Sequence, residues 1–207
     1  MQRGVFITLE GVEGAGKSTL MAYAAEYYAE KGREVIQTRE PGGTKTGEQI
    51  RAILLDSNNE TLTDNTELLL MFAARMQHID EVIKPALSSG HVIICDRFTD
   101  ATYAYQGAGR GLDITRIEAL ENWVQQGLKP DMTLLFDLDV ETGLRRANQR
   151  SDADRFEQEE IHFFERIRSC YLKRAENEPE RFRLVDASQS FEDVKLQIQT
   201  ILEEYSC

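Results

Sequence analysis

The sequence is poor in cysteine, lacks any long apolar run and carries no excess of positive charge, and each shortage excludes a class of protein. Its cysteines, Cys95, Cys170 and Cys207, have no paired spacing, which argues against a disulfide framework or a zinc site. No run of about 18 or more apolar residues is present, so we expect no membrane span. Met1 leads directly into an apolar strand pattern rather than a secretory leader, which predicts a cytoplasmic protein.

Acidic residues dominate the charge: 36 Asp and Glu face 24 Lys and Arg, which gives a net charge of −12. Binding to a nucleic-acid polymer depends on a basic surface, so we expect no such partner. A single nucleotide is different, because a few Arg and Lys side chains gathered in one cleft can hold it whatever the net charge. The composition therefore leaves small phosphorylated ligands open.

Short apolar runs alternate with amphipathic stretches along the 207 residues, a length that suits one domain. The apolar runs predict strands over Val5–Glu10, Val35–Thr38, Val92–Cys95, Met132–Asp137 and Arg183–Asp186. The stretches between them predict helices over Lys17–Lys31, Thr46–Leu55, Glu67–Ser89, Ile114–Gly127, Val140–Gln149, Gln158–Asn177 and Phe191–Tyr205. Continuously apolar strands are typical of a parallel sheet that is buried on both faces. We expect a three-layer α/β fold, with about five parallel strands between helices and ligands at the carboxyl ends of the strands.

The strongest local pattern follows the first predicted strand. Gly11-Val12-Glu13-Gly14-Ala15-Gly16-Lys17-Ser18 matches the phosphate-loop (P-loop) pattern G-x-x-x-x-G-K-[ST] and opens a predicted helix. Backbone N–H groups of such a loop turn toward phosphate oxygens, and the positive end of the helix adds to their field. We therefore expect Gly11–Thr19 to bind ATP, with Lys17 on the β- and γ-phosphates and Ser18 on Mg²⁺.

Asp96 and Arg97 come directly after the third predicted strand, at the edge of the sheet where the P-loop lies. An acidic residue there holds Mg²⁺ directly or through water, and Arg97 places positive charge where two phosphate groups meet. A salt bridge at a strand end is the alternative interpretation. The D-x-x-G and N-K-x-D motifs of a GTPase switch are missing, which favours a kinase over a switch.

A turn after the second predicted strand has the composition of an anion site. In Arg39-Glu40-Pro41-Gly42-Gly43, the proline and the glycines force the chain away from the sheet and leave Arg39 at the strand end. A guanidinium there can bind two oxygens of a phosphate monoester at once. A purely structural turn is the alternative.

Two further segments carry side chains that suit a nucleotide. Phe72 and Arg75 are three residues apart on one predicted helix and share a face. The alternative is that Phe72, which follows the apolar run Leu68–Met71, is a core residue. The segment Thr102-Tyr103-Ala104-Tyr105-Gln106 offers hydroxyl and amide groups that can bind a sugar and a pyrimidine edge. Tyrosines that only cap a loop would give the same pattern.

In their order and spacing, these motifs resemble the thymidylate kinase family. The resemblance covers about residues 5–160 and rests on the P-loop with Glu13, Arg39-Glu40-Pro41-Gly42-Gly43, Phe72-Ala73-Ala74-Arg75, Asp96-Arg97-Phe98, Ala104-Tyr105-Gln106-Gly107 and Asp154-Arg155. The family commonly has tyrosine at the position of Phe98. The resemblance implies one nucleoside monophosphate kinase domain over residues 1–207, a homodimer joined through helices, and transfer of a phosphoryl group from Mg-ATP to dTMP in dTTP biosynthesis.

The resemblance also implies roles for single residues. It places dTMP against Arg39, Pro41, Phe72, Arg75, Arg97, Thr102, Tyr103 and Gln106. In that set, Arg39, Arg75 and Arg97 hold the acceptor phosphate, while Gln106 and Arg75 address the base edge. Phe72 stacks on thymine, Tyr103 crowds the position of a ribose 2′-hydroxyl, and Glu13 lies near the 3′-hydroxyl.

Members of the family keep a catalytic arginine either in the P-loop or in a lid. The variable loop positions hold no arginine here, whereas the lid region carries Arg146, Arg150 and Arg155, with the lid itself over about residues 148–157. The chain therefore resembles the bacterial type, in which Arg155 is the first candidate and Arg150 the second. With Lys17 and Arg97, that arginine neutralises the transferred group, while Ser18 and Asp96 hold Mg²⁺. A kinase for another nucleotide or a nucleoside, and a non-catalytic P-loop switch, remain the alternatives.

Overall fold

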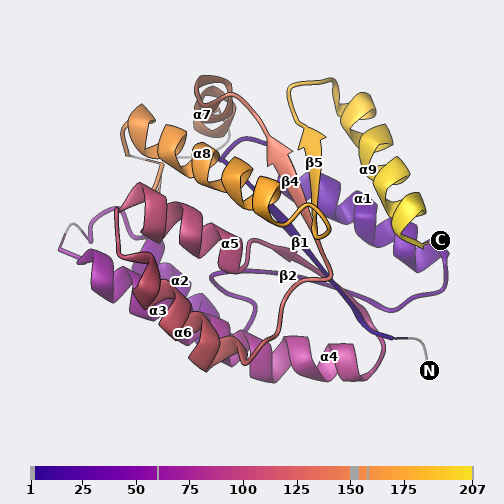
Figure 1. Ribbon diagram of the computed structural model, residues 1–207, viewed down its shortest axis with the longest axis horizontal. Coiled ribbons are helices and arrows are strands. Elements are labelled where there is room, and N and C mark those ends of the chain that lie inside the picture. Colours follow the sequence, from indigo (N-terminus) through magenta and orange to yellow (C-terminus); the bar gives the residue numbers. More distant parts are fainter. Residues whose placement is uncertain (1–2, 60, 150–153, 158, 207) are drawn as a thin grey trace.

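The computed structural model describes residues 3–59, 61–149, 154–157 and 159–206. At its centre lies a parallel sheet of five strands in the order β2-β3-β1-β4-β5 (Figure 1). The strands are β1 (Val5–Gly11), β2 (Val35–Arg39), β3 (Val92–Asp96), β4 (Met132–Asp137) and β5 (Phe182–Asp186). Each predicted strand boundary is met to within one residue, and the predicted α/β fold is confirmed. Because all neighbours run parallel, the carboxyl ends of the strands lie along one edge of the sheet.

Helices connect the strands and cover both faces of the sheet. They are α1 (Lys17–Glu30), α2 (Lys45–Leu55), α3 (Asp64–His78), α4 (Lys84–Ser88), α5 (Thr99–Thr102), α6 (Ile114–Gln125), α7 (Val140–Asn148), α8 (Ile161–Asn177) and α9 (Phe191–Ser206), with π-helical segments η1 (Ile79–Ile83) and η2 (Tyr103–Gly109). The pair α1 and α9 packs together on one side, and α5 and α8 lie on the other (Figure 1). This is the layered arrangement expected of repeated βα units.

The strands are buried on both faces, which is why their sequences read as continuous apolar runs. Successive residues of β3 alternate between two apolar clusters: Val92 and Ile94 pack in the cluster that includes residues of α1, and Ile93 and Cys95 pack in the one that includes residues of α3 and α4. All four side chains are fully buried. Apolar burial on both faces fixes the register of the central strands and hence the height at which Asp96 emerges.

The predicted helix Glu67–Ser89 is a longer helical stretch that begins earlier and contains a change of winding. The Thr63 side chain caps α3 by accepting a hydrogen bond from the backbone N–H of Thr66, so the helix starts at Asp64. The π-helical segment η1 then precedes α4, which has Pro85 in its first turn. Proline has no N–H for an interior helical bond, and a widened turn directly before it accommodates that loss.

The stretch Thr99–Gly109 is helical, as α5 followed by η2, although its sequence pattern does not predict a helix. Gly107 and Gly109 weaken the helical signal, since glycine disfavours a helix interior. The structure nevertheless needs a glycine at position 109, because a Cβ on Gly109 would lie 2.6 Å from the ring of Phe163 on α8. Close packing against α8 therefore decides the conformation of this stretch.

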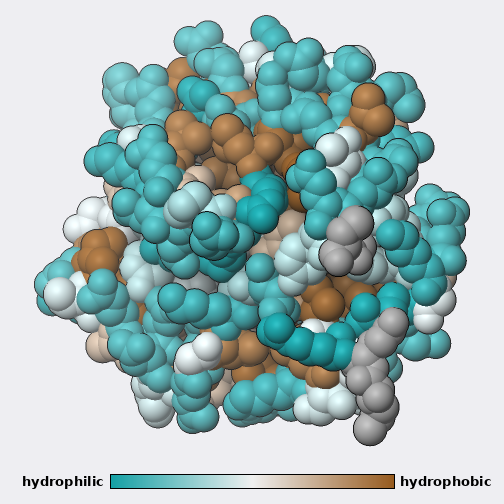
Figure 2. Space-filling model, turned by 45° about the vertical axis from the view of Figure 1, so that its right-hand side comes forward, coloured by the Kyte–Doolittle hydropathy of each residue, from teal (hydrophilic) through white to brown (hydrophobic). Residues whose placement is uncertain are grey.

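Hydrophilic side chains cover most of the face seen in Figure 2, and apolar groups appear there in separate patches. Within the described residues, no helix combines the length and the apolar character needed to cross a bilayer.

Candidate active site

A cleft of about 650 Å³ opens at the carboxyl ends of the strands. The P-loop residues Glu13–Thr19 form one wall, and the opposite side is formed by the last residues of β2 and β3 and the residues after them, Arg39–Pro41 and Asp96–Phe98. Side chains from α2, α3, α5 and η2 and from the segment before α8 also line the cleft. The fold thus brings the predicted phosphate loop and most of the predicted acceptor residues into one cavity.

The P-loop passes so close to neighbouring backbone that glycine is required at two of its positions. Gly14 has φ +71°, and a Cβ there would lie 2.0 Å from the carbonyl oxygen of Gly143 on α7. Gly11 has φ +135°, and its Cβ would lie 2.4 Å from the carbonyl oxygen of Phe136 in β4. The loop is therefore wedged between β4 and α7, with its backbone left free to face the cleft.

Lys17 is the first residue of α1, and its ammonium group lies across the loop. Nζ donates hydrogen bonds to the carbonyl oxygens of Gly11 at 2.9 Å and Val12 at 3.0 Å. Burial, followed by the nearby charge of Arg97, lowers the pKa of the Lys17 ammonium. A buried ammonium whose hydrogen bonds go to neutral carbonyl groups is well placed to exchange them for charged phosphate oxygens.

Asp96 at the end of β3 and Ser18 in α1 both line the cleft. The Oδ1 atom of Asp96 is buried and has no hydrogen-bond partner among the described residues. A carboxylate oxygen left without a donor, together with a serine hydroxyl, is a donor set that suits Mg²⁺. No group of three or more His, Cys, Asp or Glu side chains in the described part of the chain could form a metal cage. The residues therefore fit a cation that takes its other ligands from phosphates and water.

Arg97 has a left-handed backbone, with φ +69°, and lies over the P-loop. Its guanidinium donates to the carboxylate of Glu13 and lies 4.5 Å from the centre of the Tyr105 ring, while the Tyr105 hydroxyl donates to Glu13 at 3.2 Å. Burial would raise the pKa of Glu13, but the charges of Arg97 and Lys17 outweigh it and lower that pKa to about 2. Glu13 is thus a fixed anion that orients Arg97.

The backbone around Arg97 is held from behind by Glu10, the residue before Gly11. Glu10 accepts a hydrogen bond from the N–H of Phe98 at 2.7 Å and another from the Tyr171 hydroxyl at 2.8 Å. Burial, followed by the charge of Asp100, raises the pKa of Glu10 to about 7. The carboxyl group therefore links β1, the segment after β3, and α8.

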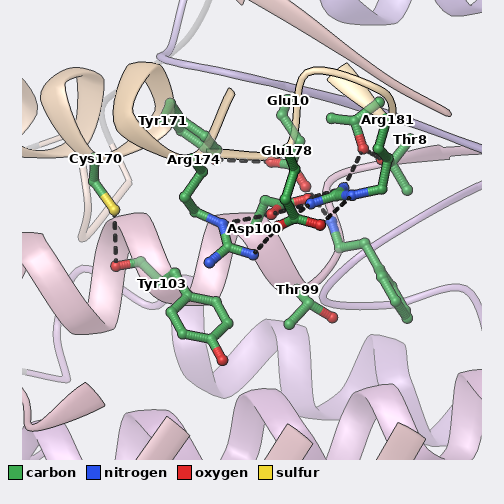
Figure 3. A network of polar contacts seen from close by, with 12 residues as sticks. Thr8, Glu10, Thr99, Asp100, Tyr103, Cys170, Tyr171, Arg174, Glu178 and Arg181 are labelled. Atoms are coloured by element: carbon green, nitrogen blue, oxygen red, sulfur yellow. Dashed lines mark hydrogen bonds and ion pairs between the residues drawn. The ribbon is translucent and has the colours of Figure 1, made fainter. Parts of the chain in front are cut away.

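Asp100 lies beside Glu10 in the buried network drawn in Figure 3. Its carboxylate accepts hydrogen bonds from Arg174 of α8 at 2.6 Å and from Arg181, just before β5, at 2.7 and 3.0 Å. Glu178 contacts both arginines (Figure 3). Despite burial, these arginines lower the pKa of Asp100, so its charge is retained. The network ties α5 to α8 and to the end of the sheet.

The cleft is rich in arginine on the side away from the P-loop, where we predict the acceptor. Arg39 is about half exposed and donates to Glu48 at 2.8 Å. Arg51 of α2 also lines the cleft and donates to the carbonyl oxygen of Pro41 at 3.0 Å. Burial, followed by the charges of Arg39 and Arg97, lowers the pKa of Arg51. Several guanidinium groups that repel one another around one cavity form a strong anion site.

Sequence reasoning missed Arg51. Its helix follows directly on the Pro-Gly-Gly turn, and Arg51 stands three residues after Glu48, so both lie on the same face. The face of a helix that starts beside a predicted phosphate turn is the signal that could have found it.

Arg75, Thr102 and Gln106 also line the cleft. Arg75 donates to Glu40 at 2.7 Å and to the Thr102 hydroxyl at 3.0 Å. Gln106 donates to Glu67 at 2.7 Å. Glu40 and Glu67 are themselves buried, so both donors are fixed before any ligand binds.

Other predicted site residues lie outside the described cleft wall. Phe72 is 2% exposed, and its ring centre lies 4.8 Å from the guanidinium carbon of Arg75. Tyr103 is buried, its hydroxyl donates to Glu121 at 2.5 Å, and its ring lies under Arg174. The first two P-loop residues, Gly11 and Val12, also lie behind the wall, where their carbonyl groups hold Lys17.

The predicted lid arginines have different surroundings. Arg155 donates to the carbonyl oxygen of Leu54 at 2.9 Å and to Glu67 at 2.5 Å, so its guanidinium faces α2 and α3. Arg146 on α7 donates to the carbonyl oxygen of Ala187 at 3.1 Å. Arg150 lies outside the described residues. The neighbours of Arg155, Asp154, Phe156 and Glu157, line the cleft.

Comparison with known proteins identifies a family. A family model described as thymidylate kinase matches residues 9–198. A thymidylate kinase of Pseudomonas syringae pv. tomato is 58% identical over 97% of this chain and 96% of its own length. One of Alcanivorax borkumensis is 56% identical over 97% of both chains. A crystal structure of thymidylate kinase from Ehrlichia chaffeensis is 31% identical, with a TM-score of 0.80 over 97% of this chain and 99% of that one.

Proposed function

This chain belongs to the thymidylate kinase family, and we infer that it carries out the reaction of that family, the phosphorylation of dTMP to dTDP with ATP. The observation that carries the inference is that one cleft contains both a P-loop and a separate set of arginines for a second phosphate. A non-catalytic switch has no need of the second set. The cleft therefore favours a transferase over a binding module.

We propose that ATP binds along the P-loop, from Gly11 to Thr19. Lys17 leaves the carbonyl oxygens of Gly11 and Val12 and bonds the β- and γ-phosphates, which offer it stronger, charged acceptors. The hydroxyl of Ser18 and the unpaired Oδ1 of Asp96 hold Mg²⁺. When bound, Mg²⁺ neutralises charge on the phosphate oxygens.

We propose that dTMP occupies the opposite side of the cleft. Arg39, Arg75 and Arg97 hold its phosphate, and the position of Arg51 makes it a fourth candidate. Gln106 and Arg75 address the base edge, and Pro41 and Thr102 border the nucleotide. Phe72 and Tyr103 lie behind the wall, so stacking on thymine and exclusion of a ribose 2′-hydroxyl require these rings to become accessible when dTMP binds.

Transfer then needs alignment and charge neutralisation more than covalent chemistry. Lys17 and Arg97 neutralise the transferred group, with Arg155 or Arg150 supplying further charge from the lid. To do so Arg155 must leave Glu67 and the carbonyl oxygen of Leu54. No general base is required, because a phosphate monoester is largely ionised near neutral pH. Glu13 orients Arg97 and lies near the sugar 3′-hydroxyl.

The assay that tests the function is ADP release with ATP against dTMP, dUMP, UMP, CMP and thymidine. We expect turnover with dTMP far above that with the ribonucleotides. Preference for thymidine would indicate a nucleoside kinase, and preference for another monophosphate would change the acceptor. No turnover on any acceptor would contradict the kinase inference.

We also propose that the protein is a homodimer joined through helices, as the family resemblance implies. Leu69 on α3 is 57% exposed, whereas its neighbour Leu68 is buried. An exposed leucine beside a core position is available for an interface on that helix. Analytical ultracentrifugation of the chain and of Leu69→Glu tests this: a dimer that Leu69→Glu weakens supports it, and a monomeric wild-type chain contradicts it.

A further inference from the structure

The guanidinium group of Arg75 is held by protein on almost every side. Nε donates to Oε2 of Glu40 at 2.7 Å, and Nη2 donates to the carbonyl oxygen of Phe98 and to the Thr102 hydroxyl, each at 3.0 Å. The rings of Phe72 and Phe98 lie 4.8 and 5.0 Å from its central carbon. Packing on almost every side keeps the guanidinium group in one orientation before any ligand binds.

The remaining nitrogen of Arg75 differs from the other two in lacking an acceptor within the described part of the chain. Nη1 is buried and has no hydrogen-bond partner among the residues described. A buried donor without an acceptor costs free energy, so such atoms usually mark a missing ligand or water. Arg75 is one of the residues that line the cleft, so a ligand there lies next to the guanidinium group whose Nη1 lacks an acceptor. The side chain is therefore set to present one nitrogen in a fixed direction.

Glu40 is fixed in turn from the side away from Arg75. Nδ1 of His78 lies 2.9 Å from Oε1 of Glu40, and Nε2 of His78 lies 2.7 Å from the hydroxyl oxygen of Thr38. Donors and acceptors match throughout if the Thr38 hydroxyl donates to Nε2 and Nδ1–H donates to Glu40, an assignment made from the network. Both carboxylate oxygens of Glu40 thus accept a hydrogen bond, Oε1 from His78 and Oε2 from Arg75.

Neighbouring backbone keeps this arrangement closed. A Cβ on Gly43 would lie 2.6 Å from the Thr38 hydroxyl oxygen and 2.7 Å from Nε2 of His78. Gly43 also has φ +76°, so the Gly-Gly turn folds directly over the pair. His78 is fully buried, and neither His78 nor Thr38 belongs to the described cleft wall. These two residues can act on a ligand only through Glu40.

We propose that Thr38, His78 and Glu40 are positioning residues for the acceptor nucleotide: they form a relay that fixes the guanidinium of Arg75 and aims Nη1 into the cleft. The inference rests on the proposed function, because the acceptor side is the part of the cleft that Arg75 lines. A carboxylate held by arginine alone can rotate, whereas one with both oxygens bonded cannot. Loss of the His78 contact therefore loosens Arg75 without removing any group that touches the ligand.

The test compares His78→Leu, which fills the space but removes the donor, with His78→Asn, whose amide N–H can replace Nδ1–H. KM values for dTMP and for ATP are measured with kcat for each. We expect His78→Leu to raise the KM for dTMP roughly tenfold, with the KM for ATP unchanged, because small misplacements of a binding group are costly. His78→Asn should recover most of the loss.

His162→Leu is the matched control. His162 also pairs with a glutamate, Glu165, but its side chain is 76% exposed on α8, so all constants should stay at wild-type values. Thr38→Val is a second variant, at the end of the relay farthest from Arg75. We expect Thr38→Val to raise the KM for dTMP less than His78→Leu does. If His78→Leu does not fold, Thr38→Val alone tests the relay.

An unchanged KM for dTMP in folded His78→Leu, or in Thr38→Val when His78→Leu is unfolded, would overturn the relay. Equal rises for dTMP and ATP, with no recovery in His78→Asn, would also overturn it, since they indicate general loosening of the fold. Wild-type protein that does not turn over dTMP contradicts the proposed function instead, and thermal melts of all variants separate folding from binding.

Discussion

Arg155 and Glu67 form an ion pair at 2.5 Å that joins the proposed lid to α3. Glu67 is fully buried, and its other oxygen accepts a hydrogen bond from Gln106 at 2.7 Å. One carboxylate therefore contacts both a proposed base-reading side chain and a proposed catalytic arginine. Exchange of Arg155 between Glu67 and the transferred phosphoryl group would change the charge next to Gln106.

Replacing Arg155 by alanine tests its catalytic role. We expect kcat to fall roughly a hundredfold, as for loss of one stabiliser of transition-state charge, with a much smaller change in dTMP affinity. Steady-state kinetics and dTMP titration measure the two effects. Arg145→Ala is the control, because Arg145 is exposed on α7 and its hydrogen bond is a long one, 3.5 Å, to Thr142. An unchanged kcat in Arg155→Ala would remove this residue from catalysis and leave Arg150 as the lid candidate.

Replacing Gly14 by alanine should abolish ATP binding while Gly32→Ala should not. Both glycines have similar left-handed backbones, with φ +71° and +74°, but a Cβ on Gly14 would lie 2.0 Å from a carbonyl oxygen and one on Gly32 meets nothing within 4 Å. The conformational penalty, about 1 kcal/mol, is thus common to both variants. The clash in Gly14→Ala adds displacement of the P-loop. Calorimetric titration with an ATP analogue distinguishes them, and equal affinities would contradict the role of Gly14 in shaping the loop.

The pH dependence of stability should report on Glu10. Its pKa is raised to about 7 in the folded chain from 4.5, so the folded state holds a proton that the unfolded state releases between these values. The stability from this group is complete below pH 4.5 and is lost as the pH rises through 7. The whole difference is roughly 3 kcal/mol, at about 1.36 kcal/mol for each pKa unit.

Glu10→Gln removes that titration and keeps acceptors and donors for Phe98 and Tyr171. Urea unfolding between pH 5 and 8 should show that wild type loses stability relative to Glu10→Gln as the pH rises. Glu13, with its pKa lowered from 4.5 to about 2, contributes stability that is lost as the pH falls below 4.5, so it does not affect the comparison between pH 5 and 8. A constant difference between the two proteins from pH 5 to 8 would contradict the assignment.

Asp100→Asn should be destabilising, because it removes the buried carboxylate that pairs with the partly buried Arg174 and Arg181 and leaves them with Glu178 alone. Breaking one side of a fully buried charge pair costs about 3–5 kcal/mol, and we expect a smaller loss here because Glu178 and solvent still reach both guanidinium groups. Asp80→Asn is the comparison: its partner Lys84 lies four residues away, both side chains are largely exposed, and such surface pairs contribute at most about 1 kcal/mol. Chemical denaturation measures both, and equal losses would contradict the structural role of the network in Figure 3.

The parts of the fold that depend on local sequence could be predicted, and those that depend on distant partners could not. The parallel strands and the P-loop follow from continuous apolar runs and from a fixed spacing of glycines and Lys17. The relay behind Arg75 joins Thr38 and Glu40 to a helix that begins more than twenty residues later. His78 alone, in an amphipathic stretch, gives no sign of such contacts.

The same reason explains why the sequence left both a binding position and a core position open for Phe72 and Tyr103. An aromatic residue three positions from an arginine fits a binding face and a core face equally well. What decides between them is the second layer of packing: Phe72 lies against the guanidinium of Arg75, and Tyr103 lies under Arg174 and bonds Glu121. Those contacts come from helices whose mutual placement no single periodicity encodes.

Because of the strand order, the strand that carries the P-loop and the strand that carries Arg39 differ in how easily they detach from the sheet. The P-loop extends from β1, which is paired on both sides, whereas Arg39 ends β2, an edge strand paired only with β3. Edge strands exchange their amide protons through smaller fluctuations than central ones. A fluctuation that detaches β2 carries away Arg39 and the start of the acceptor turn but leaves β1 in place. Mild denaturation should therefore abolish dTMP binding before ATP binding, and a partly opened chain would still hold ATP with no acceptor to receive its phosphoryl group.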